Sequence, residues 1–239
     1  MSNIMIFIPS YGHMVSSVTF ESTHLLVPML QSKGHSVGVS TYSSPEIAEV
    51  RNLAVTHWFD GMKQSSHLLM IDADMGFKPE VVVDMLALNE PMVGAIYPKK
   101  SLQTEWAASG WGKNANAGGK GHFMKVRGLG MGLFLIRRDA IEIMVEKLPD
   151  VIDTCFDVPT QHPEGRLLRL FDSLRNESGH RMSEDLSFCY RWELCGGEMW
   201  GAGGYEMVHV GMHSFRGCYA KWADEKATAD REKLAEAAE

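Results

Sequence analysis

The sequence predicts an α/β fold in which a mostly parallel central sheet is flanked by helices. Two observations lead to this class. Apolar runs too short for helices alternate with longer segments in which apolar residues recur at helical spacing. An Asp-x-Asp pair directly follows one of the apolar runs, and open α/β sheets bind their ligands at the carboxyl ends of strands.

The first hundred residues show the alternation most clearly. Strands are expected at 4–8, 37–42, 67–71 and 92–96, with helices at 15–33, 45–61 and 79–89. Gly34 ends the first helix, and Ser44 caps the second ahead of Pro45. The first three of these strands alternate with two helices, and this alternation predicts a parallel, doubly wound half.

The rest of the chain is less regular. Strands are expected at 123–127, 129–136 and 206–210, and helices at 138–148 and 184–194. Alternate glycines at Gly128, Gly130 and Gly132 let another backbone or a ligand approach closely. Residues 101–121 lose all periodicity and have about the length of an active-site lid. We expect one domain over 1–219, with a small second β-element, and a helical tail at 220–239.

The composition argues against tight non-specific binding to nucleic acid and against a membrane-spanning helix, while a local basic groove remains compatible with it. The net charge of −7 over 239 residues argues against a large basic surface for nucleic acid. No stretch approaches 18 apolar residues, so no membrane-spanning helix is expected. The N-terminus lacks the features of a signal peptide, and the four cysteines form no Cys-x-x-Cys pair. A reducing, cytoplasmic setting is therefore expected.

Asp72 and Asp74 are the main candidate site. Their mutual repulsion at about 4 Å is roughly 1 kcal/mol in water and roughly 4 kcal/mol at an effective dielectric near 20. In an extended segment both side chains point to one side, with Ala73 opposite, so both can bind one hard divalent cation. The alternative is a strand end that carries two solvated acids.

Several other residues are candidates by position. Tyr11, in the loop after the first strand, can stack on a ring, or it packs against its own turn. Lys99 and Lys100 follow a strand end and either meet a phosphate or an acidic acceptor, or remain a solvated pair. Trp106 and Trp111 are candidates for stacking on a sugar or a base. The acids of Ser183-Glu184-Asp185 suit a helix N-terminus even without a catalytic role.

Taken in order, these motifs resemble the GT-A glycosyltransferases, which have a Rossmann-like fold, and in particular the small family 2-type enzymes of phages and bacteria. A late His-x-Phe-Arg element is similar to one in the polypeptide N-acetylgalactosaminyltransferases. The motifs that carry the resemblance are Tyr11, Arg51-Asn52, Asp72-Ala73-Asp74, Tyr97-Pro98-Lys99-Lys100, the glycine-rich run at 130–136, Ser183-Glu184-Asp185 and His213-Ser214-Phe215-Arg216.

The resemblance implies roles for particular residues. Residues 1–100 would form the nucleotide-sugar half and 101–219 the acceptor half. A divalent metal, Mn²⁺ or Mg²⁺, would be held by Asp72, Asp74 and His213, with His209 as the alternative histidine. The donor would contact Pro9, Ser10, Tyr11, Arg51, Asp72 and Ala73. Asp185, with Glu184 beside it, would be catalytic, and the acceptor side would include Trp106, Gly130, Lys99 and His209.

The implied activity is transfer of a sugar from a nucleoside diphosphate, with uridine diphosphate as the default, to an acceptor hydroxyl. The acceptor is a glycan, a protein, a lipid or a modified nucleic-acid base, and the setting would be the host cytoplasm if the chain is viral. The N-acetylgalactosaminyl enzymes retain configuration and lack an Asp at the position of Asp185, which favours inversion here. The alternatives are a metal-dependent phosphohydrolase and a non-catalytic nucleotide-sugar-binding protein, which would not need Asp185.

Overall fold

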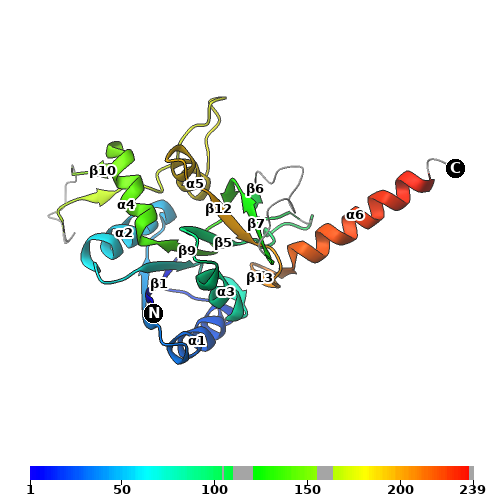
Figure 1. Ribbon diagram of the computed structural model, residues 1–239, viewed down its shortest axis with the longest axis horizontal. Coiled ribbons are helices and arrows are strands. Elements are labelled where there is room, and N and C mark those ends of the chain that lie inside the picture. Colours follow the sequence, from blue (N-terminus) through cyan, green and yellow to red (C-terminus); the bar gives the residue numbers. More distant parts are fainter. Residues whose placement is uncertain (104, 110–120, 155–163, 237–239) are drawn as a thin grey trace.

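A seven-stranded mixed sheet forms the centre of the computed structural model, which describes residues 1–103, 105–109, 121–154 and 164–236 (Figure 1). Its strands, in spatial order, are β2 (Ser36–Ser43), β1 (Asn3–Ser10), β3 (His67–Ile71), β9 (Leu133–Arg137), β5 (Met92–Ala95), β12 (Met199–Ala202) and β7 (Phe123–Val126). All except β9 and β7 run in one direction. The predicted α/β class with a mostly parallel sheet is confirmed.

Helices cover both faces of this sheet. One apolar cluster takes in α1 (Ser17–Ser32) and α3 (Glu80–Leu88), and the other takes in α2 (Ile47–Thr56), α4 (Arg138–Lys147) and α5 (Glu184–Leu194). The two groups of helices lie on opposite sides of the strands (Figure 1). A π-helical turn, His57–Gly61, continues α2, so the helical segment ends at Gly61 as the sequence predicted.

The β3 strand shows why the fully apolar runs became central strands. All five of its residues are buried. Leu69 and Ile71 pack toward α1 and α3, whereas Leu68 and Met70 pack toward α2, α4 and α5. A strand covered on both faces needs apolar residues at every position rather than at alternate ones. This packing places the end of β3, and Asp72 after it, in the middle of the sheet.

Three small sheets complete the fold. They are formed by β4 (Met75–Phe77) with β13 (Met207–Val210) and β14 (Ser214–Gly217), by β6 (Ala108–Ser109) with β8 (Gly128–Leu129), and by β10 (Ile152–Asp153) with β11 (Leu167–Leu168). The β4 strand was not predicted, because it has only three residues and contains Gly76. Gly76 allows the pairing, since a Cβ there would lie 3.1 Å from Val208 and 3.3 Å from Val18.

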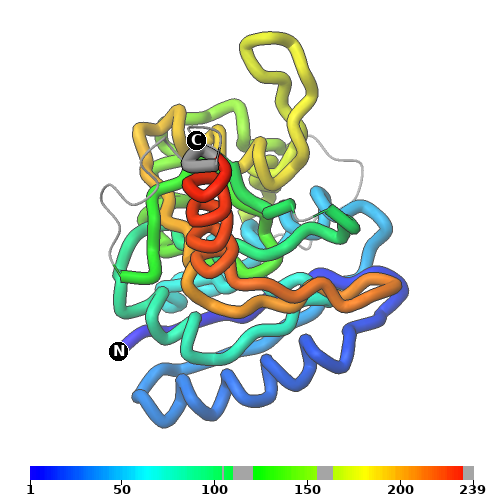
Figure 2. The backbone as a smooth tube through the Cα atoms, turned by 90° about the vertical axis from the view of Figure 1, so that its right-hand side faces the viewer, coloured from blue at the N-terminus to red at the C-terminus, as the bar shows by residue number. Residues whose placement is uncertain are grey.

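The last helix, α6 (Tyr219–Glu236), projects away from the body of the molecule (Figures 1 and 2). Its first turn is anchored, because Trp106 packs edge-on against Tyr219 and also contacts Trp222. Most of the expected 101–121 lid, including Trp111, lies outside the described residues, as does Cys155. Within the described ranges, no helix has both the length and the apolar character needed to cross a membrane.

Candidate active site

The segment Asp72-Ala73-Asp74 is a turn held by three neighbouring elements. Asp72 N–H donates to Gly132 O at 3.0 Å, and the Ala73 and Asp74 carbonyls accept from Ser16 N–H (2.7 Å) and Val210 N–H (2.8 Å). Met75 N–H closes the turn on Asp72 O at 3.1 Å. The expectation of an extended segment was therefore wrong, because backbone partners from three directions bend the chain. The two acids are instead fixed by the surrounding fold.

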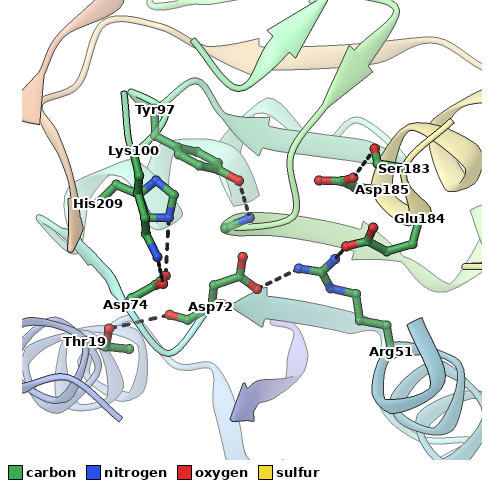
Figure 3. Close-up of polar contacts among 11 residues, drawn as sticks. Thr19, Arg51, Asp72, Asp74, Tyr97, Lys100, Ser183, Glu184, Asp185 and His209 are labelled. Atoms are coloured by element: carbon green, nitrogen blue, oxygen red, sulfur yellow. Dashed lines mark hydrogen bonds and ion pairs between the residues drawn. The ribbon is translucent and has the colours of Figure 1, made fainter. Parts of the chain in front are cut away.

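Asp74 faces two groups that can carry positive charge. Lys100 Nζ donates to Asp74 Oδ2, and His209 Nε2 lies 3.5 Å from Asp74 Oδ1 (Figure 3). Burial alone would raise the pKa of Asp74, but the contacts with His209 and Lys100 outweigh it and hold the pKa below its usual range. Asp74 is therefore a carboxylate at neutral pH.

His209 is oriented by its other ring nitrogen. Nδ1 lies 3.0 Å from Pro98 O, and a carbonyl can only accept, so Nδ1 carries a proton. The ring also packs edge-on against Tyr97, with centroids 5.2 Å apart. Nε2 faces Asp74 Oδ1, which is shielded from solvent and has no hydrogen-bond partner among the described residues. An imidazole nitrogen and a carboxylate oxygen are both atoms that can serve as ligands of a divalent cation.

Arg51 joins the two halves of the site. Its guanidinium is only 3% exposed and donates to Asp72 Oδ1 and to Glu184 Oε1, both at 2.8 Å (Figure 3). Burial alone would lower the pKa of Arg51, but Asp72, Asp185 and Glu184 together raise it. Arg51 is thus a permanent cation that links the end of β3 to the first turn of α5.

The two neighbouring acids of α5 have different surroundings. Glu184 is bound to Arg51, whereas Asp185 accepts from Ser183 Oγ at 2.6 Å. Ser183 is also the N-cap, since its Oγ accepts from Leu186 N–H at 3.4 Å. The Asp185 carboxylate points toward the space that Asp72 and the Tyr97 hydroxyl also face (Figure 3). Of the two acids, Glu184 is the one held by Arg51, and Asp185 is the one held by the N-cap serine.

Tyr97 explains the glycines of the 130–136 run. Its side chain lies over both glycines: a Cβ on Gly130 would come within 2.2 Å of the Tyr97 hydroxyl oxygen, and a Cβ on Gly132 within 2.7 Å of the ring. Gly132 N–H donates to the Tyr97 hydroxyl at 3.1 Å. Burial, followed by the nearby Asp72 and Asp185, raises the pKa of Tyr97. The close approach that the alternate glycines indicated is therefore made by a tyrosine side chain.

The predicted donor residues lie at the end of β1 and in the turn after β3. Pro9 and Ser10 are the last two residues of β1 and are buried, and Ala73 is half-buried. Tyr11 is 70% exposed, and the next residues, Gly12 and His13, are left-handed with φ of 60° and 59°. That conformation turns the loop back on itself, with Met14 N–H donating to Tyr11 O at 3.2 Å. Tyr11 therefore presents an open ring face.

Other predicted residues lie elsewhere. His213 is exposed in the turn between β13 and β14, and Trp106 is 7% exposed in the packing of α6. Lys99 is exposed and pairs with Glu105 at 3.2 Å. Among the residues that the structure describes, no three His, Cys, Asp or Glu side chains already converge as a metal site.

Comparison with known proteins gives a fold. No protein-family model matches the sequence, and no curated protein matches it. Of the similar solved structures, GalNAc-T7 with UDP, GalNAc and Mn²⁺ has a TM-score of 0.51 and 9% identity, covering 88% of this chain and 44% of that one. A protein from STIV has a TM-score of 0.48 and 16% identity, with 87% and 85% of the two chains covered. The catalytic domain of Drosophila beta1,4-galactosyltransferase 7 has a TM-score of 0.48 and 10% identity, with 91% and 71% covered. The likeness to GalNAc-T7 shows the fold alone, and that fold is the GT-A arrangement that the sequence predicted.

Proposed function

We propose that this chain is a metal-dependent glycosyltransferase that moves a sugar from a nucleoside diphosphate to an acceptor hydroxyl with inversion. One observation carries the proposal. Asp74 Oδ1 and His209 Nε2 face each other 3.5 Å apart at the end of a central strand, and Asp185 points into the same space from α5 (Figure 3). The arrangement offers a cation site and a free carboxylate on opposite sides of one space.

The side chains at this end of the sheet suit a divalent cation. Asp74 and His209, with Asp72 beside them, supply oxygen and imidazole nitrogen donors, a set that binds Mn²⁺ or Mg²⁺. The resemblance pointed to His213, but the position of His209 favours it as the nitrogen donor. Such a cation would neutralise the charge that develops on the departing diphosphate. The Pro98 carbonyl, which holds Nδ1, would keep His209 in the binding tautomer.

Asp185 would act as the general base. The acceptor oxygen attacks the anomeric carbon while the bond to the diphosphate oxygen breaks, and the hydroxyl proton moves to a carboxylate oxygen of Asp185. Glu184 is less suited, because Arg51 already binds it. Arg51 is occupied by Asp72 and Glu184, so we assign it the positioning of both sides of the site rather than direct contact with the donor.

Ligands of structural neighbours guide the first choice of probes. GalNAc-T7 was solved with UDP and Mn²⁺, so these are the first nucleotide and metal to test. Donor binding is measured as a thermal shift with Mn²⁺ and a panel of nucleoside diphosphates. A ligand at about 100 times its dissociation constant adds roughly 2.7 kcal/mol of stability, which is about 5–10 °C for a chain of this size. The shift should require metal and be lost in Asp74→Ala.

Turnover is measured as slow hydrolysis of the donor, in which water replaces the acceptor. Asp185→Asn should lower this rate by about 10²–10⁴-fold and leave the nucleotide-dependent shift intact, whereas Glu184→Gln should keep most of the rate. A rise in melting temperature with Mn²⁺ that no nucleotide increases further would instead support a phosphohydrolase. Nucleotide binding with no turnover by the unaltered chain would support a binding protein.

A further inference from the structure

Lys100 holds the second carboxylate oxygen of Asp74, beside the oxygen that faces His209. Its Nζ donates to Asp74 Oδ2 (Figure 3), and the two side chains are 39% and 33% exposed. The aliphatic stem passes over Gly211, where a Cβ would lie 3.2 Å from Lys100 Cδ and 3.6 Å from Cγ. A side chain at that position would crowd the stem, so Gly211 leaves room for the lysine to reach the acid.

The backbone fixes which of the two lysines makes this contact. Lys99 N–H donates to Glu105 O at 2.8 Å, and Ser101 N–H donates to Lys99 O at 2.9 Å. The Lys99 side chain pairs with Glu105 on the surface. The same segment supplies the Pro98 carbonyl that orients His209. One short stretch after β5 therefore positions both of the groups that face Asp74.

We propose that Lys100 is an internal counter-cation of Asp74 that moves to the diphosphate of the donor when a divalent metal binds. This inference rests on the proposed function. An ammonium and a divalent ion repel each other when both lie on one carboxylate. Lysine has a flexible stem and three N–H donors, and once displaced it needs acceptors within reach. The phosphate oxygens bound to the same metal are acceptors of that kind.

The exchange makes metal and nucleotide bind cooperatively. Metal alone must displace Lys100 from Asp74 and leaves the ammonium without a partner. Metal bound together with a nucleoside diphosphate gives the ammonium a new one. Because coupling between two ligands is reciprocal, each should raise the affinity for the other. A neutral residue at position 100 should bind metal alone more tightly and lose part of this coupling.

The test measures Mn²⁺ dissociation constants by electron paramagnetic resonance, with and without saturating UDP, for Lys100→Met, Lys100→Arg and Lys99→Met. Lys100→Met should bind Mn²⁺ alone about tenfold more tightly, and UDP should improve its affinity by a factor several-fold smaller than in the unaltered chain. Lys99→Met is the matched control: it removes the same charge one residue away, and both constants should stay within about twofold. Lys100→Arg should behave as the unaltered chain does.

A second readout needs no nucleotide. Without metal, Lys100→Met should melt about 2 °C lower than the unaltered chain, because Asp74 loses its charge partner, and Mn²⁺ should abolish this difference. Equal Mn²⁺ affinities for Lys100→Met and the unaltered chain, or an unchanged effect of UDP, would overturn the proposal. So would failure of both proteins to bind Mn²⁺. If Lys100→Met bound Mn²⁺ and the unaltered chain did not, Lys100 would be the counter-cation of Asp74, but the native chain would not depend on metal. Asp185→Asn should have the same Mn²⁺ dissociation constants as the unaltered chain even if it loses turnover, so the two proposals can fail separately.

Discussion

Replacing Arg51 with Met tests whether this side chain holds the site together. Arg51 is 3% exposed and makes two ion pairs of 2.8 Å, one to Asp72 and one to Glu184. Methionine has a similar length and keeps the apolar packing, but it leaves two carboxylates without their shared cation. Breaking a buried ion pair costs about 3–5 kcal/mol. Because both carboxylates are about one-fifth exposed and can gain water, we expect a loss near the lower end, ~3 kcal/mol.

The assay is urea unfolding, with the free energy of unfolding obtained by linear extrapolation. Glu184→Gln alone and combined with Arg51→Met completes a double-mutant cycle. The coupling energy should be about 1–2 kcal/mol, because the two side chains are in direct contact. Arg127→Met is the matched control: Arg127 pairs with Glu193 at 2.6 Å but is 68% exposed, and a pair of that kind contributes at most about 1 kcal/mol.

A loss from Arg51→Met no larger than that from Arg127→Met would refute the reasoning. Arg51 would then not be a structural link between the end of β3 and α5. Its guanidinium would be available to the donor, which is the role that the resemblance implied. A loss of nucleotide binding without a loss of stability would lead to the same conclusion.

Three further changes test other parts of the fold. Gly132→Ala places a Cβ within 2.7 Å of the Tyr97 ring and should cost about 1–3 kcal/mol in urea unfolding, less in a Tyr97→Val background. Burial lowers the pKa of His67 from 6.5 to about 4, so the unfolded chain binds the proton first. Stability should therefore fall as the pH drops from about 6.5 to 4. In a plot of the urea midpoint against pH, His67→Gln should flatten the curve over this range. Ser183→Ala removes an N-cap and the hydrogen bond to Asp185, and it should lower the free energy of unfolding by about 1 kcal/mol.

Local patterns predicted the elements of the first half well, because β1, β3 and β5 are largely buried on both faces and show as apolar runs. They could not predict that β9 runs against its neighbours. Its apolar run, Leu133–Arg137, has the same composition as a parallel strand, and only the chain path decides the direction. The β12 strand, Met199–Ala202, was missed because Gly201 and Ala202 lack the β-branched and aromatic residues typical of strands.

The site was predictable where a motif supplied the chemistry and unpredictable where packing supplied it. Asp72, Asp74 and the acids of α5 were identified from their positions at element ends. That Arg51 contacts Glu184, 133 residues away, depends on how α2 and α5 are placed on the same face of the sheet. The choice between His209 and His213 depends on the β4–β13 pairing, in which His209 lies opposite Met75, immediately after Asp74.

The two acids of the Asp72–Asp74 turn have different counter-charges, and this difference sets how the site can change. Asp72 is paired with Arg51, a guanidinium that is buried, held by a second carboxylate and therefore fixed. Asp74 is paired with Lys100, a partly exposed ammonium on a flexible stem. The repulsion expected between the acids is therefore relieved before any metal binds, and the turn keeps its shape through backbone hydrogen bonds to Ser16, Gly132 and Val210. A cation that arrives at Asp74 has only to replace Lys100, so metal binding can be readily reversible while the framework around Asp72 stays in place.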